Sequence, residues 1–263
     1  MRSAPPIFLA LGFLAAASSP IAEEPDLFGG EFPLSGYLYM GDQVRALQDD
    51  EFQNPGLFAV EFGEELWSTP TGGKGLSCQS CHEEASDSMR SVAATYPQFD
   101  EELGSLVNLE ARINEMLTAY MDAPAFPQES DELLSLTAFV TFQSRGIPIG
   151  VDISGEAERY WQEGHEFYTQ RRGQLNLACN QCHDDLAGFN LRGDRISQGH
   201  VNGFPVYRLM WNSMGSRHRM FRWCNWAVRA EPYELGSREY LSLELYLAWR
   251  SNGLPIEAPA VRP

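Results

Sequence analysis

Apolar side chains recur along much of the chain at intervals of three and four residues, the spacing that places them on one face of an α-helix. One such stripe runs from Leu109 through Ile113, Met116 and Leu117 to Tyr120. Segments with the strict alternation of apolar and polar residues that is typical of strands are few. The pattern therefore predicts a mainly α-helical protein.

Two further helices are predicted at similar places, in residues 130–149 and 237–256. Nine of their twenty aligned positions are identical, at an offset of 107 residues. Each segment begins with a serine that can cap a helix, Ser130 or Ser237, and each ends with a glycine and then a proline, which stop one. This similarity indicates an internal repeat.

The pattern Cys-x-x-Cys-His occurs twice, at residues 78–82 and 179–183. It is the attachment signature of c-type haem, in which both thiols bind the porphyrin covalently and the histidine ligates the iron. A four-cysteine zinc site or two redox-active dithiols would use the thiols but would not explain a histidine after each pair. The motifs predict two covalently bound haem c groups, attached through Cys78, Cys81, Cys179 and Cys182 and ligated by His82 and His183.

The repeat and the motifs together predict the domain organisation. A Gly-x-Glu-x-aromatic pattern precedes each motif, beginning at Gly63 and Gly164, an offset of 101 residues. We therefore predict two tandem cytochrome c-like haem domains related by the internal repeat, in residues 23–150 and 151–263.

The N-terminus has the pattern of a secretory signal peptide. Arg2 precedes a short apolar run, residues 7–17, and small residues follow up to Ala22. Residues 1–22 are predicted to be removed on export to the periplasm, although an uncleaved anchor is an alternative. No other stretch has the roughly 20 apolar residues of a membrane span. The formal charge of −17 disfavours binding to nucleic acid or anionic membranes.

The repeat also predicts a sixth ligand for each iron. Tyr96-Pro97 resembles Phe204-Pro205 at an offset of 108 residues, and the same offset places Met116 opposite Cys224. Met116 is therefore the predicted distal ligand of the first haem. A core packing role is the alternative for Met116, and Met89 and Met121 are lesser candidates as ligands.

Cys224 is the fifth cysteine and has no partner once the motif thiols are assigned. We predict that it ligates the second haem or stands over it; an inert buried thiol or an intermolecular disulfide are the alternatives. His218 is a weaker candidate, because the repeat pairs it with Glu110. Five neighbouring cationic side chains could lower the pKa of the thiol: Arg217, His218, Arg219, Arg222 and Arg229. Three of them, Arg219, Arg222 and Arg229, are also predicted to bind an oxyanion of sulfur or an acidic partner surface.

Residues 222–233, with the continuation from 241 to 254, resemble the active-site segment of the SoxA family. The resemblance implies a cytochrome subunit of the periplasmic thiosulfate-oxidising system, the catalytic subunit of L-cysteine S-thiosulfotransferase. It implies a SoxX-like monohaem cytochrome as partner, and a SoxYZ-like sulfur carrier and thiosulfate as substrates. It also implies that Cys224 ligates the second haem and can carry an extra sulfur as a persulfide.

Two departures from the family pattern stand out. Dihaem relatives generally have cysteine at the position of Met116, so a methionine ligand is expected here instead. The family's substrate-binding arginine lies four residues before the active cysteine, and that position is Met220. Arg219 and Arg222 are its neighbours, and neither faces the way of Cys224 as well as a residue four back on a helix.

The predicted reaction joins thiosulfate to a carrier cysteine with the loss of two electrons, by way of Cys224 as the nucleophile. The rival enzyme activity is that of a dihaem thiosulfate dehydrogenase forming tetrathionate. The non-enzymatic alternative is an electron carrier in which Cys224 only ligates iron.

Overall fold

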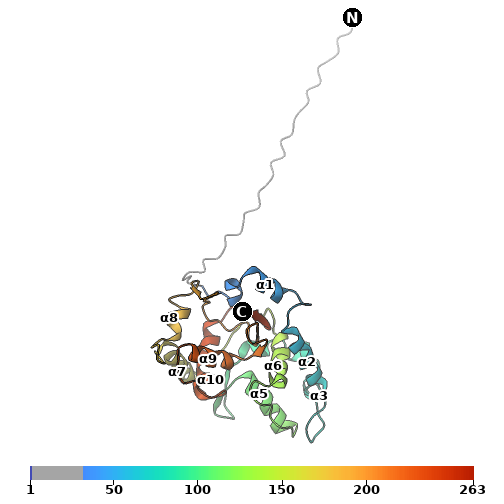
Figure 1. Cartoon of the computed structure of the whole chain (residues 1–263). Helices are drawn as coiled ribbons and strands as arrows, with labels where there is room; N and C mark the ends of the chain where they lie inside the picture. The colour runs from blue at the N-terminus through green and yellow to red at the C-terminus, as the bar shows by residue number, and fades with distance from the viewer. Residues whose placement is uncertain (2–31) are drawn as a thin grey trace.

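The computed structural model describes Met1 and residues 32–263 (Figure 1). Apart from Met1, the predicted signal peptide lies outside the described residues. None of the helices in this part of the chain is long and apolar enough to cross a membrane. The fold is mainly helical, as predicted, with α1 (Asp42–Asp49), α2 (Leu57–Ser68), α3 (Cys78–His82), α4 (Ala85–Ser88), α5 (Leu109–Glu115), α6 (Asp131–Phe142), α7 (Ala157–Thr169), α8 (Cys179–His183), α9 (Arg217–Ala227) and α10 (Arg238–Arg250).

Shorter elements complete the described chain. The first half contains two 3-10 turns and one π-helical turn: η1 (Gly36–Tyr39), η2 (Val92–Thr95) and η3 (Met116–Tyr120). Strands of two or three residues form three small antiparallel hairpins, and β7 adds to the last of them in parallel. The hairpins are β1 (Gln98–Asp100) with β2 (Ser105–Val107), β3 (Asn190–Leu191) with β4 (Asp194–Arg195), and β5 (Val206–Arg208) with β6 (Ser213–Gly215); β7 (Ala260–Arg262) pairs with β5. Strands this short are too brief to show a period of two, so the sequence did not predict them.

The core is built on two closely packed helix pairs, α2 with α6 and α7 with α10. A Cβ atom added to Gly63 on α2 would lie 2.1 Å from the backbone oxygen of Ser135. A Cβ atom added to Gly164 on α7 would lie 2.1 Å from that of Ser242. Glycine at these two positions lets each pair of helix backbones touch.

The predicted caps of α6 and α10 are confirmed. Ser130 Oγ accepts a hydrogen bond from the backbone N–H of Leu133, and Ser237 Oγ accepts one from that of Tyr240. The helices end at Phe142 and Arg250, a few residues before the glycines that were expected to stop them.

The segments that follow these two helices pair with each other across the molecule. The backbone N–H groups of Gly146 and Ile149 donate to the oxygens of Ile256 and Leu254, and those of Gly253 and Ile256 donate to the oxygens of Ile149 and Ile147. We call residues 146–149 and 253–256 the clasp. The clasp joins the two halves of the chain by backbone hydrogen bonds.

Each half contains, in order, a helix, a helix formed by the Cys-x-x-Cys-His residues, a hairpin and two further helices. This order supports the internal repeat, which remains an interpretation of the sequence. The N-terminal segment reaches over the second half, where Asn54 Nδ2 donates to the oxygen of Pro259 at 3.0 Å and Gln48 Oε1 accepts from the N–H of Val261 at 3.1 Å. The domain boundary near residue 150 remains a prediction.

Candidate functional site

Both Cys-x-x-Cys-His motifs fold as single helical turns, α3 and α8. Ser77 caps α3 by accepting from the N–H of Ser80, and Gln181 Oε1 accepts from the N–H of Ala178 at the start of α8. A helical turn directs residues three apart to the same side, so the two thiols of each motif can reach one edge of a porphyrin. The chain thus presents the donor set of a c-type haem on each helix.

The histidine of the second motif is held in a defined orientation. His183 Nδ1 donates to the backbone oxygen of Ser197 at 2.7 Å, which leaves Nε2 as the nitrogen that could bind an iron ion. Gly199 lies against this ring: it has a φ of +75°, and a Cβ atom there would be 3.0 Å from His183 Cγ. In the first motif the ring of His82 lies 5.7 Å from that of Trp67, whose Nε1 donates to the oxygen of Glu83.

The five cysteines are all free thiols in the part of the chain that the structure describes. No group of three or more His, Cys, Asp or Glu side chains within Met1 and residues 32–263 is arranged to hold a metal ion. The thiols of α3 and α8 therefore do not form the four-cysteine zinc site considered as an alternative.

Met116 and Cys224 occupy similar positions on their helices. Asn108 caps α5 through the N–H of Ala111, and Ser216 caps α9 through the N–H of Arg219. Each candidate ligand lies eight residues after its cap. Met116 begins the π-helical turn and is half-buried. Local π-helical turns are often found at functional sites. Haem ligation by either residue remains a prediction.

Cys224 lies close to the thiols of α8. Burial and the neighbouring Cys224 raise the pKa of Cys179 to about 12. Burial raises the pKa of Cys224 to about 11, Arg208 opposes this rise and Cys182 adds to it. The fold thus brings the unpaired cysteine to the second haem motif, across 42 to 45 residues of sequence.

The expectation that the five neighbouring cationic side chains lower the pKa of Cys224 is wrong. The cation that does so is Arg208, from β5. Arg219 Nη1 donates to Ser213 Oγ at 3.1 Å and to the Met214 oxygen at 2.9 Å, and its guanidinium lies over the Trp211 ring. The hairpin therefore holds Arg219.

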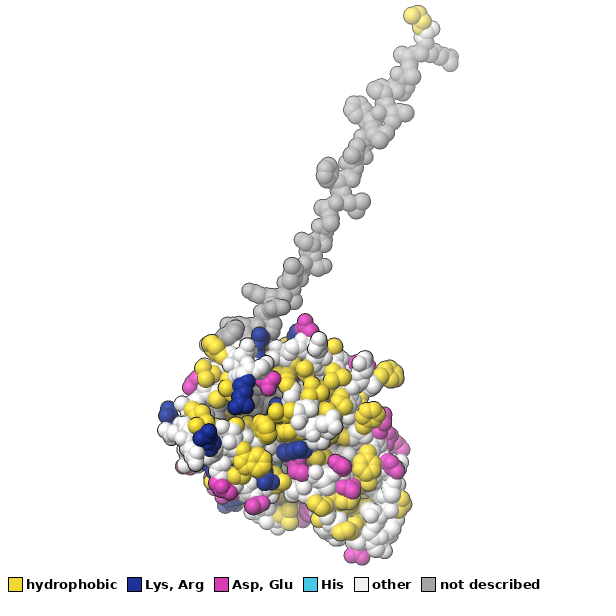
Figure 2. Space-filling view, in the orientation of Figure 1, with side chains coloured by type: hydrophobic (Ala, Val, Ile, Leu, Met, Phe, Trp, Pro, Cys, Tyr) yellow, Lys and Arg dark blue, Asp and Glu magenta, His cyan; other side chains and the backbone are white. Residues whose placement is uncertain are grey.

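Of the other two predicted substrate-binding arginines, Arg222 is on α9 and Arg229 follows its end. Arg222 lies over the ring of Trp226 at 5.3 Å, and Arg229 is exposed with a φ of +58°. Binding of substrate by any of the three arginines remains a prediction. Figure 2 shows Lys and Arg side chains gathered with apolar ones over the region of α8 and α9. Exposed apolar residues there include Leu209, Met210, Trp223 and Trp226.

Arg208 is the functional candidate that sequence reasoning missed. Its Nη1 donates to Met220 Sδ at 3.5 Å and its Nε to the backbone oxygen of Pro263 at 2.8 Å. Its guanidinium lies 5.2 Å from the centre of the Trp211 ring. The one sequence signal was its place three residues after Pro205, within the aligned repeat.

His218 is buried, with both ring nitrogens against protein groups, which leaves neither of them open to an iron ion. Its Nδ1 accepts from the N–H of Gly236 at 3.0 Å, and its Nε2 faces Glu244 Oε2 at 2.9 Å. Arg217 Nη1 contacts the other oxygen of Glu244 at 2.7 Å. His200 likewise has Ser251 Oγ and Gln198 Oε1 beside its two nitrogens.

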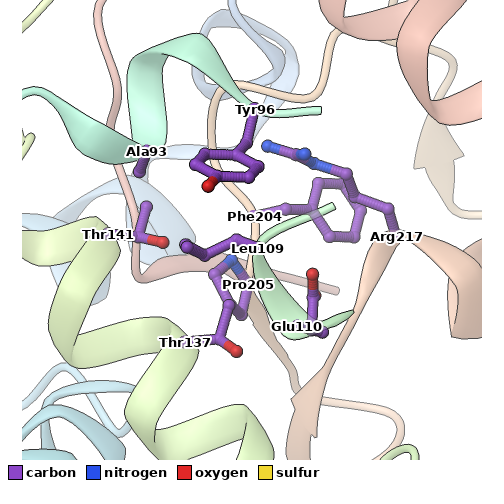
Figure 3. Close-up of a pocket in the computed structure, with 9 residues that line it drawn as sticks. All are labelled: Ala93, Tyr96, Leu109, Glu110, Thr137, Thr141, Phe204, Pro205 and Arg217. Atoms are coloured by element: carbon purple, nitrogen blue, oxygen red, sulfur yellow. The ribbon is translucent and has the colours of Figure 1, made fainter. Parts of the chain in front are cut away.

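Glu110 lies at the same junction between the halves and lines a small cavity of about 10 Å³ (Figure 3). Burial and the charge of Glu244 raise the pKa of Glu110 to about 7. The contacts of His218, Arg217 and Asn108 lower the pKa of Glu244 to about 2 against the cost of its burial. The junction therefore holds one carboxylate in its charged form beside a second that is readily protonated.

Comparison with known proteins places these features in a family. Residues 62–149 match the family model described as SoxA/TsdA, cytochrome c domain. The chain is 41% identical to the L-cysteine S-thiosulfotransferase subunit SoxA of Pseudaminobacter salicylatoxidans, covering 87% of this chain and 80% of that protein. It is 38% identical to the subunit of the same name from Rhodovulum sulfidophilum, covering 87% and 79%. A crystal structure of SoxXA from P. pantotrophus superposes with a TM-score of 0.85, at 38% identity and covering 88% of this chain and 87% of that one.

Proposed function

The chain belongs to the SoxA family, and we propose that it is the catalytic cytochrome subunit of an L-cysteine S-thiosulfotransferase. In this role it couples thiosulfate oxidatively to a cysteine of a SoxYZ-like sulfur carrier protein. The proposal rests on the position of Cys224, an unpaired thiol that the fold brings beside the α8 motif.

The reaction forms one sulfur–sulfur bond and releases two electrons. A carrier thiol, R–SH, and thiosulfate give R–S–S–SO₃⁻, one proton and two electrons. In this reaction Cys224 is the site at which the thiosulfate sulfur is first held. The carrier thiolate then attacks this sulfur and displaces Cys224, as in thiol–disulfide exchange. Each c-type haem, when bound, accepts and passes on one electron at a time.

The chain's own residues prepare this chemistry. His183 is oriented by the backbone oxygen of Ser197, so its Nε2 is the nitrogen that would hold the haem iron. The thiols of Cys179 and Cys182 are near enough to Cys224 for their charges to interact, so the group they would hold and the reacting sulfur belong to one site. We further propose that Cys78, Cys81 and His82 hold a second haem with Met116 as its distal ligand.

We also propose the assembly and the compartment. The SoxXA structure that this chain resembles contains a SoxX partner, and a SoxX-like monohaem cytochrome is proposed as the partner here. Export to the periplasm follows from the signal-peptide pattern in the sequence.

The test uses the complex of this chain with its monohaem partner, a purified carrier, thiosulfate and an oxidised cytochrome c as electron acceptor. We expect a thiosulfate adduct on the carrier cysteine, seen by intact mass, together with two electrons accepted for each adduct. A carrier with its cysteine alkylated is the control and should give neither.

The alternatives predict different outcomes in the same assay. Tetrathionate formed from thiosulfate without the carrier would assign a thiosulfate dehydrogenase activity and contradict the proposal. Reversible reduction of the haems without any adduct or tetrathionate would assign an electron carrier. Intact mass of the chain tests the haem count and shows whether Cys224 carries an additional sulfur.

A further inference from the structure

Arg208 is held at the site by three contacts from three directions. Met220 Sδ accepts from its Nη1, the backbone oxygen of Pro263 accepts from its Nε, and the Trp211 ring lies against its guanidinium. The pairing of β5 with β6 on one side and β7 on the other fixes the backbone of the same residue. A side chain anchored in this way loses little additional freedom when it binds a ligand.

The contact with Met220 directs Arg208 toward Cys224. Met220 lies one helical turn before Cys224 on α9, and residues four apart share a helix face. Arg208 also lies close enough to Cys224 for each to affect the charge of the other. No aspartate or glutamate side chain among the described residues is within ion-pair distance of Arg208. Asp194 acts on this charge from beyond ion-pair distance, and Nε already contacts an oxygen of Pro263. Nη2 donates to no described residue, so this side of the guanidinium is open to an anion.

The first half of the chain has the opposite arrangement at the aligned positions. Asp100 ends β1 as Arg208 ends β5, and Arg112 lies four residues before Met116 as Met220 lies four before Cys224. Asp100 and Arg112 form an ion pair, and Glu115 binds the other side of Arg112. Two carboxylates pair with Arg112 in the first half, whereas no aspartate or glutamate among the described residues forms an ion pair with Arg208 in the second.

We propose that Arg208 binds the oxyanion end of thiosulfate and so orients its outer sulfur toward Cys224. Met220 provides no positive charge on α9, and Arg208 on β5 supplies one in its place. This inference rests on the proposed function and adds a substrate-binding residue to it. A guanidinium suits this task because it can donate two parallel hydrogen bonds to the oxygens of one sulfonate group.

The test is the variant Arg208→Gln in the haem-loaded complex, assayed with carrier and thiosulfate. Loss of a charge-assisted hydrogen bond to an anion raises the KM for thiosulfate roughly 10- to 100-fold. Inhibition by sulfate, an unreactive oxyanion of similar charge, should weaken to the same extent. The KM for the carrier should stay unchanged. Arg145→Gln is the matched control, since Arg145 is an exposed arginine of the first half, and it should change none of these values.

A second variant separates charge from packing. The double variant Arg208→Gln with Met220→Arg moves the cation from the strand to the helix. Its KM for thiosulfate should fall most of the way back to the wild-type value. The absorbance spectrum of the haems and the melting temperature show whether each variant is folded and loaded.

An unchanged KM for thiosulfate in Arg208→Gln, or a raised KM with sulfate inhibition intact, would overturn the inference. Failure of the double variant to recover would also overturn it, because the loss would then come from packing. If the wild-type complex itself forms no adduct, the proposed function fails instead, and direct binding of sulfate to Arg208→Gln and wild type decides the role of Arg208 separately.

Discussion

The hairpin and helix of the first half and those of the second half follow one another in the same order but carry different side chains. In β1 and α5 an acidic strand residue, Asp100, pairs with the helix residue Arg112, and a thioether follows at Met116. In β5 and α9 the strand residue is Arg208, the helix residue is Met220, and a thiol follows at Cys224. The first arrangement cancels its charge within the protein. The second leaves a cation beside a nucleophile.

This difference indicates that the two halves do different work. A site with a thioether, whose arginine is already paired with carboxylates, is suited to holding a haem that only passes electrons, since a methionine ligand raises its reduction potential. A site with a free thiol and an unneutralised guanidinium is suited to binding and reacting with an anion. We therefore expect substitutions at aligned positions to have unequal effects on catalysis.

The largest expected effect is that of Cys224→Ala. Removing the nucleophile should lower the turnover of carrier conjugation by roughly 100-fold or more. Met116→Ala, its aligned counterpart, should change the absorbance spectrum of the first haem while leaving measurable conjugation. Both are followed by the rate of adduct formation on the carrier, with haem content measured for each. Intact turnover in Cys224→Ala would remove the covalent role and with it the contrast between the halves.

The next largest effect is expected from adding a Cβ atom where the backbones of two helices touch. Gly63→Ala and Gly164→Ala each place a Cβ atom 2.1 Å from a backbone oxygen of the facing helix. Each should lower the free energy of unfolding by about 2–4 kcal/mol, since the backbones must separate. Urea titration measures this, and Gly150→Ala, whose Cβ would meet nothing within 4 Å, is the control. Unequal costs would mean that the two helix pairs are not equivalent.

The carboxylates at the junction should respond to pH in opposite directions. The pKa of Glu110 is raised from 4.5 to about 7, so it favours the folded state when protonated, and the stability it contributes is lost as the pH rises through this range. Glu110→Gln should therefore gain about 1–3 kcal/mol relative to wild type between pH 5 and pH 8.

Glu244 is the matched comparison. Its pKa is lowered from 4.5 to about 2, so its contribution is present above pH 4.5 and lost as the pH falls toward 2. Glu244→Gln should destabilise the protein at neutral pH, and the difference from wild type should shrink in acid. Chemical denaturation at several pH values measures both variants. Parallel pH profiles for the two would contradict the assigned directions.

The smallest expected effect is that of Asp100→Asn. It removes the ion pair with Arg112 but leaves Arg112 in contact with Glu115, so the loss of stability should be smaller than that of any variant above. The KM for thiosulfate should not change, because the altered charge lies in the half that does not bind the anion. A marked change in this KM would show that the first half takes part in substrate binding.

Sequence reasoning found the features that depend on local spacing. The helical turns of the haem motifs, the caps Ser130 and Ser237, and the common register of Met116 and Cys224 all follow from residues near each other in the chain. Arg208 was not found because it lies on a three-residue strand whose partners come from distant segments, β7 and α9. The hydrogen bonds of Arg219 within the hairpin were missed for the same reason.

The clasp has a consequence for the history of the chain. In it, two like segments bind each other in antiparallel fashion about Pro148 and Pro255, and each backbone hydrogen bond donated by one segment has a counterpart donated by the other. Pairing of like with like about a two-fold axis is the geometry of a homodimer. The clasp thus has the form that the interface between two copies of a one-haem ancestor would keep after their genes were fused. Under this interpretation, fusion would remove the requirement that both copies be identical, so that one could have Cys224 where the other has Met116.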